Sequence, residues 1–271
     1  MLDWAKIWDE NSYNFTLEER LKQNENWDIY FSDRAENTKN TLSFNNDEVV
    51  EHLLYENILQ NSSSVLDMGS AFGKYSVPFS KYVDRVTAVD LSKTSLDILD
   101  DFATKNGIKN IETICTAWEL YHPKEKFDFV FSSMCPAMCT RQDVERLEAM
   151  SNKYCCLVTA CKTFYTGNRK KLNELITDKE IKAFHSDCSF VFNYLYEQTK
   201  FPDVKMICQK VQNKLTIDEA KKAYKDHFHN FGFDDARSVD IIDKFVEENA
   251  VDGIVTDNRV FNKAVITWKV K

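Results

Sequence analysis

Two of the few glycines in this chain stand close together, and their position constrains the fold more than any other feature. The sequence has only 6 glycines among 271 residues, whereas average usage of about 7% would give about 19. Gly69 and Gly73 therefore mark a place where the backbone must turn sharply or come close to another group. They directly follow Ser64-Val65-Leu66-Asp67-Met68, a short apolar run that predicts a buried strand.

Strand and helix signals alternate along the chain after this turn. Strands are predicted at 64–68, 85–90, 111–116, 127–133 and 154–160, and helices at 74–83, 92–105 and 140–151. Alternation of this kind, with continuously apolar strands, is typical of a parallel sheet that is covered on both faces. Residues 61–162 are therefore predicted to form a doubly wound α/β core.

The segments on either side of this core have a different character. Residues 1–60 are rich in Trp, Tyr, Phe and Asn and predict helices that pack on the core. Residues 163–235 predict two or three helices and one strand at 204–210, as expected of an insertion that caps a substrate site. Residues 236–271 predict a helix and a final apolar strand that complete the core.

Acidic residues stand at the ends of the first two predicted strands. Asp67 precedes the glycine turn, and Asp90 ends the second strand. Because ligands of doubly wound sheets bind beyond the carboxyl ends of the strands, Asp90 is placed to accept hydrogen bonds from both ribose hydroxyls of a nucleoside. The sequence therefore predicts a cofactor that contains adenosine.

The spacing of the glycines distinguishes between two such cofactors. A dinucleotide site uses Gly-x-Gly-x-x-Gly, so that the pyrophosphate lies on a helix N-terminus. Here the spacing is Gly-x-x-x-Gly, and Asp67 would repel a pyrophosphate. This pattern favours a cationic cofactor that carries an amino acid, S-adenosyl-L-methionine.

At three places in the right order, the sequence resembles the class I S-adenosylmethionine-dependent methyltransferases. These places are Val65-Leu66-Asp67-Met68-Gly69-Ser70-Ala71-Phe72-Gly73, Val86-Thr87-Ala88-Val89-Asp90-Leu91-Ser92 and Phe127-Asp128-Phe129-Val130-Phe131-Ser132-Ser133. The resemblance covers residues 28–162. It implies a Rossmann-like, mostly parallel seven-stranded sheet with helices on both faces, an N-terminal helical lid, and a helical insertion after the fifth strand.

The resemblance also implies which residues bind the cofactor. Gly69 and Gly73 would line the methionine moiety, Asp90 would hold the ribose, and Leu91 would lie against the adenine. An Asp-Ala pair that the family often has after the third strand is replaced here by Thr116-Ala117-Trp118. The full set of candidate cofactor-binding residues is Asp67, Gly69, Ser70, Gly73, Asp90, Leu91, Thr116, Ala117, Trp118, Ser132, Ser133, Tyr30 and Arg34.

Tyr30 and Arg34 belong to this set because Trp27 to Ala35 looks like the lid helix of many small-molecule methyltransferases. Either side chain could reach the cofactor's carboxylate, and Arg34 could do so with two parallel hydrogen bonds. The alternative is that the aromatic residues of this segment are packing residues and that Arg34 forms a surface ion pair.

The segment after the fourth strand bears on the methyl acceptor. Methyltransferases of exocyclic base amines or glutamine amides usually have Asn/Asp-Pro-Pro-Tyr/Phe there, whereas this chain has Ser133-Met134-Cys135-Pro136-Ala137-Met138. The missing acid or amide disfavours DNA and protein-amide substrates, and a small-molecule acceptor remains. His185, Cys135 and Tyr194 are weak candidates for a base or positioning group, because a base is needed only when the nucleophile arrives protonated.

Charge and apolar content further limit the possible partners and location. The formal net charge is −8 with 35 basic and 43 acidic residues, which disfavours nucleic acid as a partner. No apolar run reaches the roughly 18 residues of a membrane span. Met1 to Lys6 does not resemble a secretory signal. We therefore expect a cytoplasmic protein without a membrane partner.

The cysteines are expected to be reduced and mostly buried. There are 8 of them, without a C-x-x-C pair. Cys135 and Cys139 could be drawn with His227 and His229 as a metal site, but the spacings are unspecific and no metal is expected.

Three alternatives to a small-molecule methyltransferase stay open at this point. The first is a protein that binds S-adenosylmethionine as a scaffold without catalysis, which the missing acid at Thr116 motivates. The second is an RNA methyltransferase, which needs a basic face. The third is a nicotinamide-dependent dehydrogenase, against which the glycine spacing argues.

Overall fold

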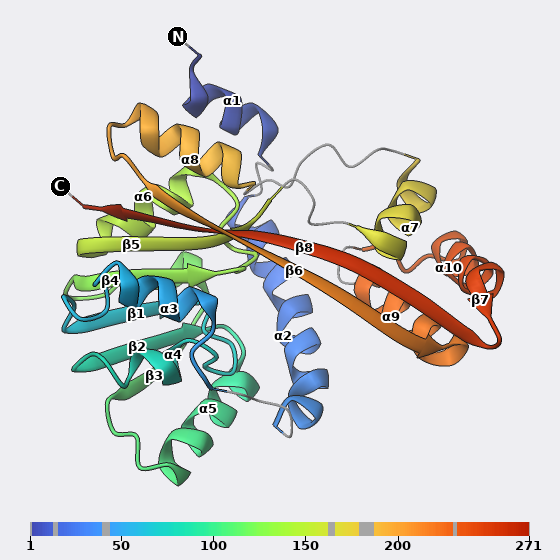
Figure 1. Ribbon diagram of the computed structural model, residues 1–271, viewed down its shortest axis with the longest axis horizontal. Helices are drawn as coiled ribbons and strands as arrows, with labels where there is room; N and C mark the ends of the chain where they lie inside the picture. The colour runs from blue at the N-terminus through green and yellow to red at the C-terminus, as the bar shows by residue number, and fades with distance from the viewer. Residues whose placement is uncertain are drawn as a thin grey trace.

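The computed structural model describes residues 2–12, 16–39, 44–161, 166–178, 187–229 and 232–270. A twisted sheet forms the body of the molecule, and a long two-stranded ribbon leads from it to a smaller helical lobe (Figure 1). We call this smaller lobe, made by 167–177, 208–229 and 232–262, the cap lobe. Among the helices in the described ranges, none combines the length and apolar character needed to cross a bilayer.

The sheet has the strand order β3-β2-β1-β4-β5-β8-β6, and a short strand, β7, pairs with β8. The strands are β1 (Ser64–Met68), β2 (Arg85–Asp90), β3 (Ile111–Cys115), β4 (Phe127–Ser133), β5 (Ser151–Ala160), β6 (Asp203–Thr216), β7 (Ala250–Val251) and β8 (Ile254–Lys269). The first five are parallel, and β8 runs antiparallel to both β5 and β6. The predicted doubly wound, mostly parallel sheet is confirmed.

Strand β1 lies between β2 and β4, so the chain leaves it in opposite directions on its two sides. Val65 is paired with Val86 of β2 and with Phe129 of β4. This reversal of strand order opens a crevice at the carboxyl end of β1, which is the usual ligand position in such sheets. The glycine turn follows β1 at this crevice.

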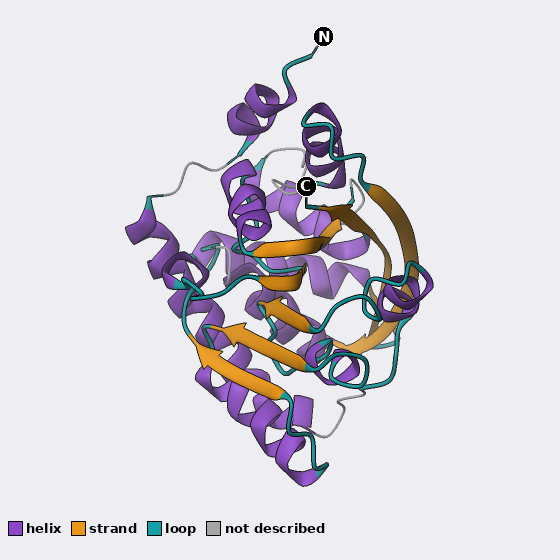
Figure 2. Cartoon of the chain, turned by 90° about the vertical axis from the view of Figure 1, so that its left-hand side faces the viewer, coloured by secondary structure: helices purple, strands orange, loops and turns teal. Residues whose placement is uncertain are grey.

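Helices cover both faces of the sheet (Figure 2). They are α1 (Trp4–Asn11), α2 (Leu17–Lys39), α3 (Glu48–Tyr55), α4 (Ser76–Phe79), α5 (Lys93–Lys105), the 3-10 helix η1 (Trp118–Leu120), α6 (Arg141–Ala149), α7 (Gly167–Thr177), α8 (Cys188–Glu197), α9 (Ile217–His229) and α10 (Ala236–Asn249). One face packs on α3, α4 and α5, and the other on α1, α6 and α8.

The side-chain alternation of the strands explains the two apolar cores. In β1, Val65 faces the core under α3, while Leu66 and Met68 face the core under α6. Because both faces are covered, β1 is apolar from Val65 to Met68 except at Asp67, whose side chain is also buried.

Two predicted elements have different lengths from those expected. The helix predicted at 74–83 is the short α4, Ser76–Phe79, with Pro78 in its first turn, where a missing N–H is tolerated. The strand predicted at 204–210 continues to Thr216, and it pairs with β8 from Asp203 opposite Thr267 to Thr216 opposite Ile254. The helical insertion after the fifth strand is present as α7 and α8.

The outer half of the β6/β8 ribbon leaves the sheet and is supported by its own core. A two-stranded ribbon alone is marginally stable in water. Here α7, α9 and α10 pack on it through Leu172, Tyr224, Phe228, Val246 and Val255, which are all buried. The cap lobe therefore has an apolar core separate from those of the sheet.

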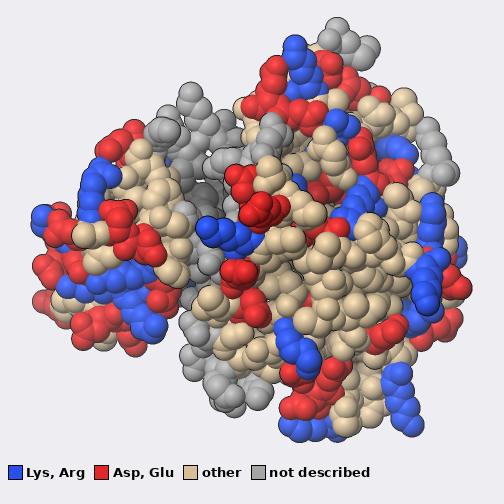
Figure 3. Space-filling model, turned by 180° about the vertical axis from the view of Figure 1, so that it is seen from behind, with Lys and Arg blue, Asp and Glu red and all other residues tan. Residues whose placement is uncertain are grey.

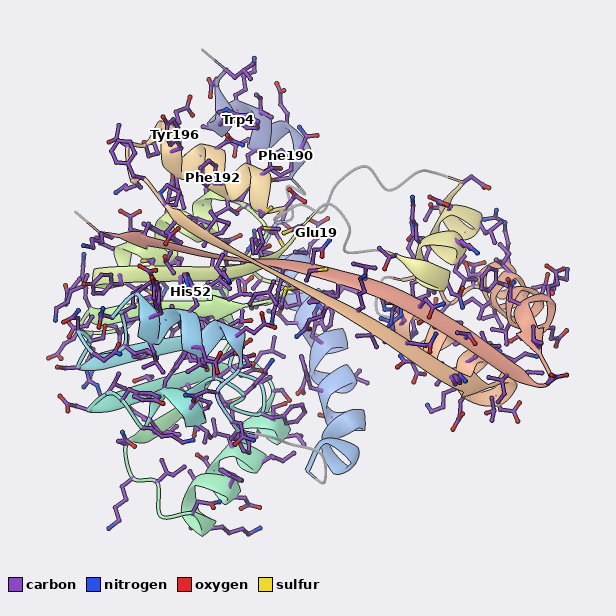
Figure 4. The ribbon with its side chains drawn as sticks, viewed as in Figure 1. Trp4, Glu19, His52, Phe190, Phe192 and Tyr196 are labelled. Carbon is purple, nitrogen blue, oxygen red and sulfur yellow. The ribbon has the colours of Figure 1, made fainter. Side chains whose placement is uncertain are left out.

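Helix α1 attaches to the body through aromatic contacts with α8. Trp8 is fully buried, with Phe190 stacked on it at 6.3 Å and Tyr194 edge-on at 5.8 Å between ring centroids. Figure 4 shows Trp4 of α1 above α8, where Phe192 and Tyr196 stack on each other at 6.1 Å. The Trp4 amide also donates to Glu197 at the end of α8, at 3.2 Å.

Helix α2 is held on the body by a largely buried ion pair between Arg20 and Asp143 of α6. Arg20 donates from both terminal nitrogens to the two carboxylate oxygens, at 3.0 and 3.1 Å. Asp143 also forms the capping box of α6 with Thr140 and accepts the indole N–H of Trp118 at 3.0 Å. One carboxylate thus joins α2, η1 and α6.

We predict that Arg20→Gln lowers the free energy of unfolding by about 2–4 kcal/mol, because it leaves a buried carboxylate without its cation. Chemical denaturation of the two proteins measures this difference. Lys6→Gln is the matched control: it removes a cation from the exposed pair with Glu10, 3.8 Å apart, and should have little or no effect. Equal stability of Arg20→Gln and the parent would contradict the proposed anchoring.

Candidate active site

The glycine turn after β1 has a backbone conformation that explains both of its glycines. Gly69 and Gly73 have φ of 75° and 83°, in the left-handed region. A Cβ at Gly69 would lie 2.7 Å from the Cys135 Sγ, and one at Gly73 would lie 2.3 Å from the Leu99 Cδ1. Conformation and lack of space therefore both require glycine at these positions.

Asp90 braces this turn from the end of β2. Its Oδ2 accepts the backbone N–H of Ala71 at 2.8 Å, and its Oδ1 accepts that of Ser92 at 2.9 Å. Ala71 itself has a φ of 46°, unusual for a residue with a side chain. Each carboxylate oxygen has a second lone pair, so Asp90 can still accept hydrogen bonds from a ligand.

A second carboxylate, Asp28 of helix α2, lies within electrostatic reach of Asp90. Burial raises the pKa of Asp90, and the negative charge of Asp28 adds to this rise. The Oδ1 of Asp28 and the Oγ of Ser70 in the glycine turn are buried, and neither has a hydrogen-bond partner among the described residues. Buried polar atoms of this kind are normally satisfied, so the turn and α2 together provide acceptors for a ligand that carries hydroxyl or ammonium groups.

Asp67 lies beneath the turn and is almost completely buried. It accepts the hydroxyl of Ser76 at 2.6 Å. Burial raises the pKa of Asp67 to about 7, the hydrogen bond from Ser76 opposes this rise, and the charge of Asp90 adds to it. Two buried carboxylates therefore lie within electrostatic reach of each other on either side of the glycine turn.

Helix α2 crosses the loops that follow four of the parallel strands. Beyond β1, Phe31 packs edge-on against Phe72, with ring centroids 5.8 Å apart. Beyond β2, Ser32 donates to Thr94 at 3.2 Å. Beyond β3, Glu119 accepts a hydrogen bond from Asn24 of α2 at 3.3 Å. Beyond β4, the Ala137 carbonyl accepts one from Arg20 of α2 at 3.4 Å.

The residues expected at the adenine lie along the loops after β2 and β3. The Thr116 amide donates to the Asp90 carbonyl at 2.9 Å, so Leu91, Thr116 and Ala117 lie near the end of β2. Trp118 is buried, its indole N–H is bonded to Asp143, and Arg146 lies over its ring at 4.6 Å. These contacts account for the Trp118 side chain within the protein.

The other residues predicted for the site lie in three different settings. Ser132 donates to the Met68 carbonyl at 2.9 Å and ties β4 to β1, and Ser133 lies beside the Tyr75 hydroxyl. Tyr194 lies instead in the packing of α1, α6 and α8, where its hydroxyl donates to Glu145 at 2.5 Å. The side chains of Tyr30 and Arg34, and the whole of His185, fall outside the part of the chain that the structure describes.

Cys135 lies directly above the glycine turn, with its sulfur in the space that Gly69 leaves. Burial raises the pKa of this thiol to about 12. At neutral pH Cys135 is therefore a protonated thiol that shapes the site, because only a thiolate is strongly nucleophilic.

The sequence interpretation missed Asp28 and a second polar group beside the turn. In this group, Asp47 is bonded to Lys74, whose Nζ is 3.0 Å away, and to the Tyr75 hydroxyl at 3.2 Å. Asp47 is also the N-cap of α3. Asp47 and Asp28 lie far from the glycine motif in the sequence, and only the folded chain brings them to it.

Possible metal ligands come together elsewhere. Within the described ranges, one group of three has metal-ligand spacing: His52 and Glu56 at α3, and Asp203 at the start of β6. Two of the three are exposed. Cys135, Cys139, His227 and His229 are not brought into such a group among the described residues.

Acidic and basic side chains alternate over the surface that Figure 3 presents. Lys and Arg are interspersed with Asp and Glu on both the body and the cap lobe of this face. This distribution differs from the continuous basic stripe by which nucleic-acid-binding proteins are recognised.

Comparisons with known proteins agree with this geometry. The sequence matches the family described as "Methyltransferase domain" over residues 65–157. Two solved structures share the fold. YcgJ from Bacillus subtilis has a TM-score of 0.51 and 17% identity, and the match covers 82% of this chain and 99% of YcgJ. A candidate methyltransferase from Bacillus halodurans C-125 has a TM-score of 0.53 and 15% identity, and the match covers 82% of this chain and 98% of that protein.

A further structure, coclaurine N-methyltransferase bound to N-methylheliamine and SAH, has a TM-score of 0.48 and 14% identity, and covers 97% of this chain and 91% of its own. No curated protein matches this sequence.

The raised pKa of Asp67 predicts how stability depends on pH. The folded pKa of about 7 lies above the ordinary 3.8, so the folded chain binds more protons than the unfolded chain between these values. The contribution of Asp67 is therefore fully present below about pH 4 and is lost as the pH rises through 7.

We predict that the difference between the melting temperatures of Asp67→Asn and the parent shifts by about 5–10 °C in favour of the variant from pH 5 to pH 8. The parent has to bury a charge as Asp67 ionises, and the variant does not. Differential scanning calorimetry of both proteins without ligand measures this difference. A difference that stays constant from pH 5 to pH 8 would contradict a buried, titrating Asp67.

Proposed function

Residues 65–157 are a class I S-adenosylmethionine-dependent methyltransferase domain, and we propose that the protein transfers the methyl group of this cofactor to a small-molecule acceptor in a pocket closed by α2. The observation that carries the proposal is the pair of acids at the glycine turn: Asp90, which is buried, and Asp28, whose Oδ1 is buried. Asp90 and Asp28 of α2 lie within electrostatic reach of each other, and the nearby Ser70 hydroxyl is buried without a hydrogen-bond partner among the described residues.

The residues at the turn fit S-adenosylmethionine in shape and charge. The carboxylate of Asp90 would accept the ribose hydroxyls, and Gly69, Ser70 and Gly73 would border the methionine moiety. The acids suit a cofactor that carries both an ammonium and a sulfonium charge, whereas they would repel a pyrophosphate. The Ser70 hydroxyl, which has no hydrogen-bond partner in the part of the chain that the structure describes, would supply a further hydrogen bond.

The adenine would lie between the loops after β2 and β3. Leu91 would cover one side of the ring, and Thr116 and Ala117 would border its edge. We assign Trp118 a supporting role, because its N–H is already bonded to Asp143 and its ring lies under Arg146. Tyr30 and Arg34 on α2 remain candidates for binding the cofactor's carboxylate.

When bound, S-adenosylmethionine supplies a methyl group on a positively charged sulfur. Transfer is an in-line displacement, so the protein contributes mainly alignment of the acceptor and exclusion of water. Helix α2 would exclude water from above, and Ser132, Ser133 and Cys135 would form the wall at the end of β4. Cys135 is a poor base because its thiol is protonated near neutral pH.

Two features favour a small molecule over RNA as the acceptor. The net charge of −8 works against binding a polyanion. Helix α2 also lies across the loops after β1, β2, β3 and β4, where a folded RNA would have to approach. A pocket closed by α2 would suit a ligand that can be enclosed.

The first test is a thermal melt with S-adenosylhomocysteine, S-adenosylmethionine and NAD in parallel. A ligand at about 100 times its Kd stabilises by about 2.7 kcal/mol, which corresponds to a rise of about 5–10 °C for a domain of this size. We expect this rise with the two adenosylsulfur ligands only. No rise with either of them, or an equal rise with NAD, would contradict the proposal.

We predict that Asp90→Asn weakens S-adenosylhomocysteine binding about 10- to 100-fold, because the ribose loses a charged acceptor. Asp97→Asn, on the outer side of α5, is the matched control and should bind like the parent. Isothermal titration calorimetry gives the three affinities. An unchanged affinity in Asp90→Asn would show that the cofactor lies elsewhere.

We also predict that S-adenosylhomocysteine protects α2 from proteolysis. The ligand would give partners to Asp28 on α2 and to Ser70 beneath it, and would thereby stabilise the closed position of the helix. Limited proteolysis with and without ligand, followed by mass spectrometry, measures the rate of cleavage within 17–39. Equal rates in both conditions would contradict a lid role for α2, and cleavage at other sites is the internal control.

A further inference from the structure

Three side chains that can ligate a metal ion meet where the end of α3 lies against the start of β6. They are His52 in the last turn of α3 (Figure 4), Glu56 directly after that helix, and Asp203, the first residue of β6. One ring nitrogen of His52 and one carboxylate oxygen of each acid lie within 4.8 Å of one another. Imidazole and carboxylate groups are ordinary ligands of Zn²⁺.

The pairing of the strands explains how Asp203 reaches α3. Asp203 is opposite Thr267 of β8, and side chains alternate along a strand, so Asp203 lies on the same face of the sheet as Ile207. Ile207 belongs to the core under α3. The fold therefore brings a carboxylate of β6 to the helix that already carries His52 and Glu56.

The two carboxylates of this group have no counter-charge in the part of the chain that the structure describes. Neither Glu56 nor Asp203 forms an ion pair with a described basic residue, and the Oδ1 of Asp203 accepts only the amide of Val204, at 2.8 Å. Two carboxylates this close together repel each other. A divalent cation bound between them would replace this repulsion with attraction.

His52 provides an independent indication of a ligand. Its Nε2 is buried and has no hydrogen-bond partner among the described residues. Buried polar atoms normally have a partner, and imidazole is the commonest metal ligand in proteins. His52 and Glu56 are four residues apart, which places their side chains on the same side of the helix. The carbonyl end of α3 also favours a positive charge at this position.

We propose that His52, Glu56 and Asp203 bind a Zn²⁺ ion, which joins the end of α3 to the start of β6. The two acids are exposed, so the ion can reach the site and water can complete its coordination. Helix α3 begins beside the glycine turn, where Asp47 is bonded to Lys74, and the three ligands lie at its other end. The ion therefore has a structural role that is separate from the proposed methyl transfer.

Isothermal titration calorimetry with Zn²⁺ alone, after treatment of the protein with a chelator, tests this site. We expect the parent to bind Zn²⁺, and His52→Gln and Asp203→Asn each to weaken binding at least tenfold, because one of three ligands is lost. Asparagine at position 203 keeps the Oδ1 that accepts the Val204 amide, so this variant preserves the start of β6.

His229→Gln is the matched control. It removes an exposed imidazole that also lies beside a carboxylate, with the His229 Nδ1 2.9 Å from the Asp234 Oδ2, and it should bind Zn²⁺ like the parent. Exposed thiols such as Cys208 are present in all four proteins and do not distinguish them. No Zn²⁺ binding by the parent, or equal affinities in the parent, His52→Gln and Asp203→Asn, overturns the inference.

Thermal melts give a second measurement. Zn²⁺ at about 100 times its Kd should raise the melting temperature of the parent and of His229→Gln by about 5–10 °C. The rise should be absent in His52→Gln and Asp203→Asn, and melts without metal verify that both are folded. An equal rise in all four proteins overturns the inference. Neither measurement contains S-adenosylhomocysteine, so the metal site and the proposed function are tested separately.

Discussion

The site depends on a buried carboxylate that holds a glycine turn open. Asp90 accepts the amides of Ala71 and Ser92 and so joins the loops after β1 and β2 at the point where the strand order reverses. These amides would otherwise be buried without partners in a turn with two left-handed glycines. The same carboxylate is the proposed ribose acceptor. The Asp90 carboxylate therefore supports the turn and is also the proposed ligand of the cofactor. A substitution at Asp90 is expected to affect both stability and cofactor affinity.

A second acid, Asp143, determines where α2 lies. It caps α6, accepts the Trp118 indole and pairs with Arg20, which holds the first turns of α2 near the end of β4. From this anchor the helix runs over the glycine turn to Phe72. Most helices attach to a protein body through an apolar stripe, but α2 has few apolar side chains. One buried ion pair and scattered contacts position it instead. A polar contact, the ion pair between Arg20 and Asp143, thus fixes the position of α2 over the site.

Local patterns predicted the core well and the connections between distant segments poorly. The signals of the strand at 127–133 and of the helix at 140–151 come from neighbouring residues, and the structure confirms both elements. Asp28 carries no local signal, because its importance comes from Asp90, which lies on another element. The outer half of β6 was missed because its side chains are mostly exposed and polar, so only pairing with β8 makes it a strand. The pairing of Asp143 with Arg20 likewise carries no local signal, because 123 residues separate them in the sequence.

The cap lobe solves a problem that the sheet alone leaves open. The crevice at β1 can hold a cofactor, but the acceptor needs a surface that approaches from the opposite side. We propose that β6 and β8, which extend beyond the sheet as continuous strands, provide this surface, and the separate core around Tyr224 stiffens them. Between two apolar cores, a charged stretch such as Arg259 to Lys263 is costly unless it is paired or meets a ligand. On this connecting stretch of β8 the Nε of Arg259 lies 3.2 Å from the buried carboxylate of Asp257, so the strand passes from one core to the other with this charge paired.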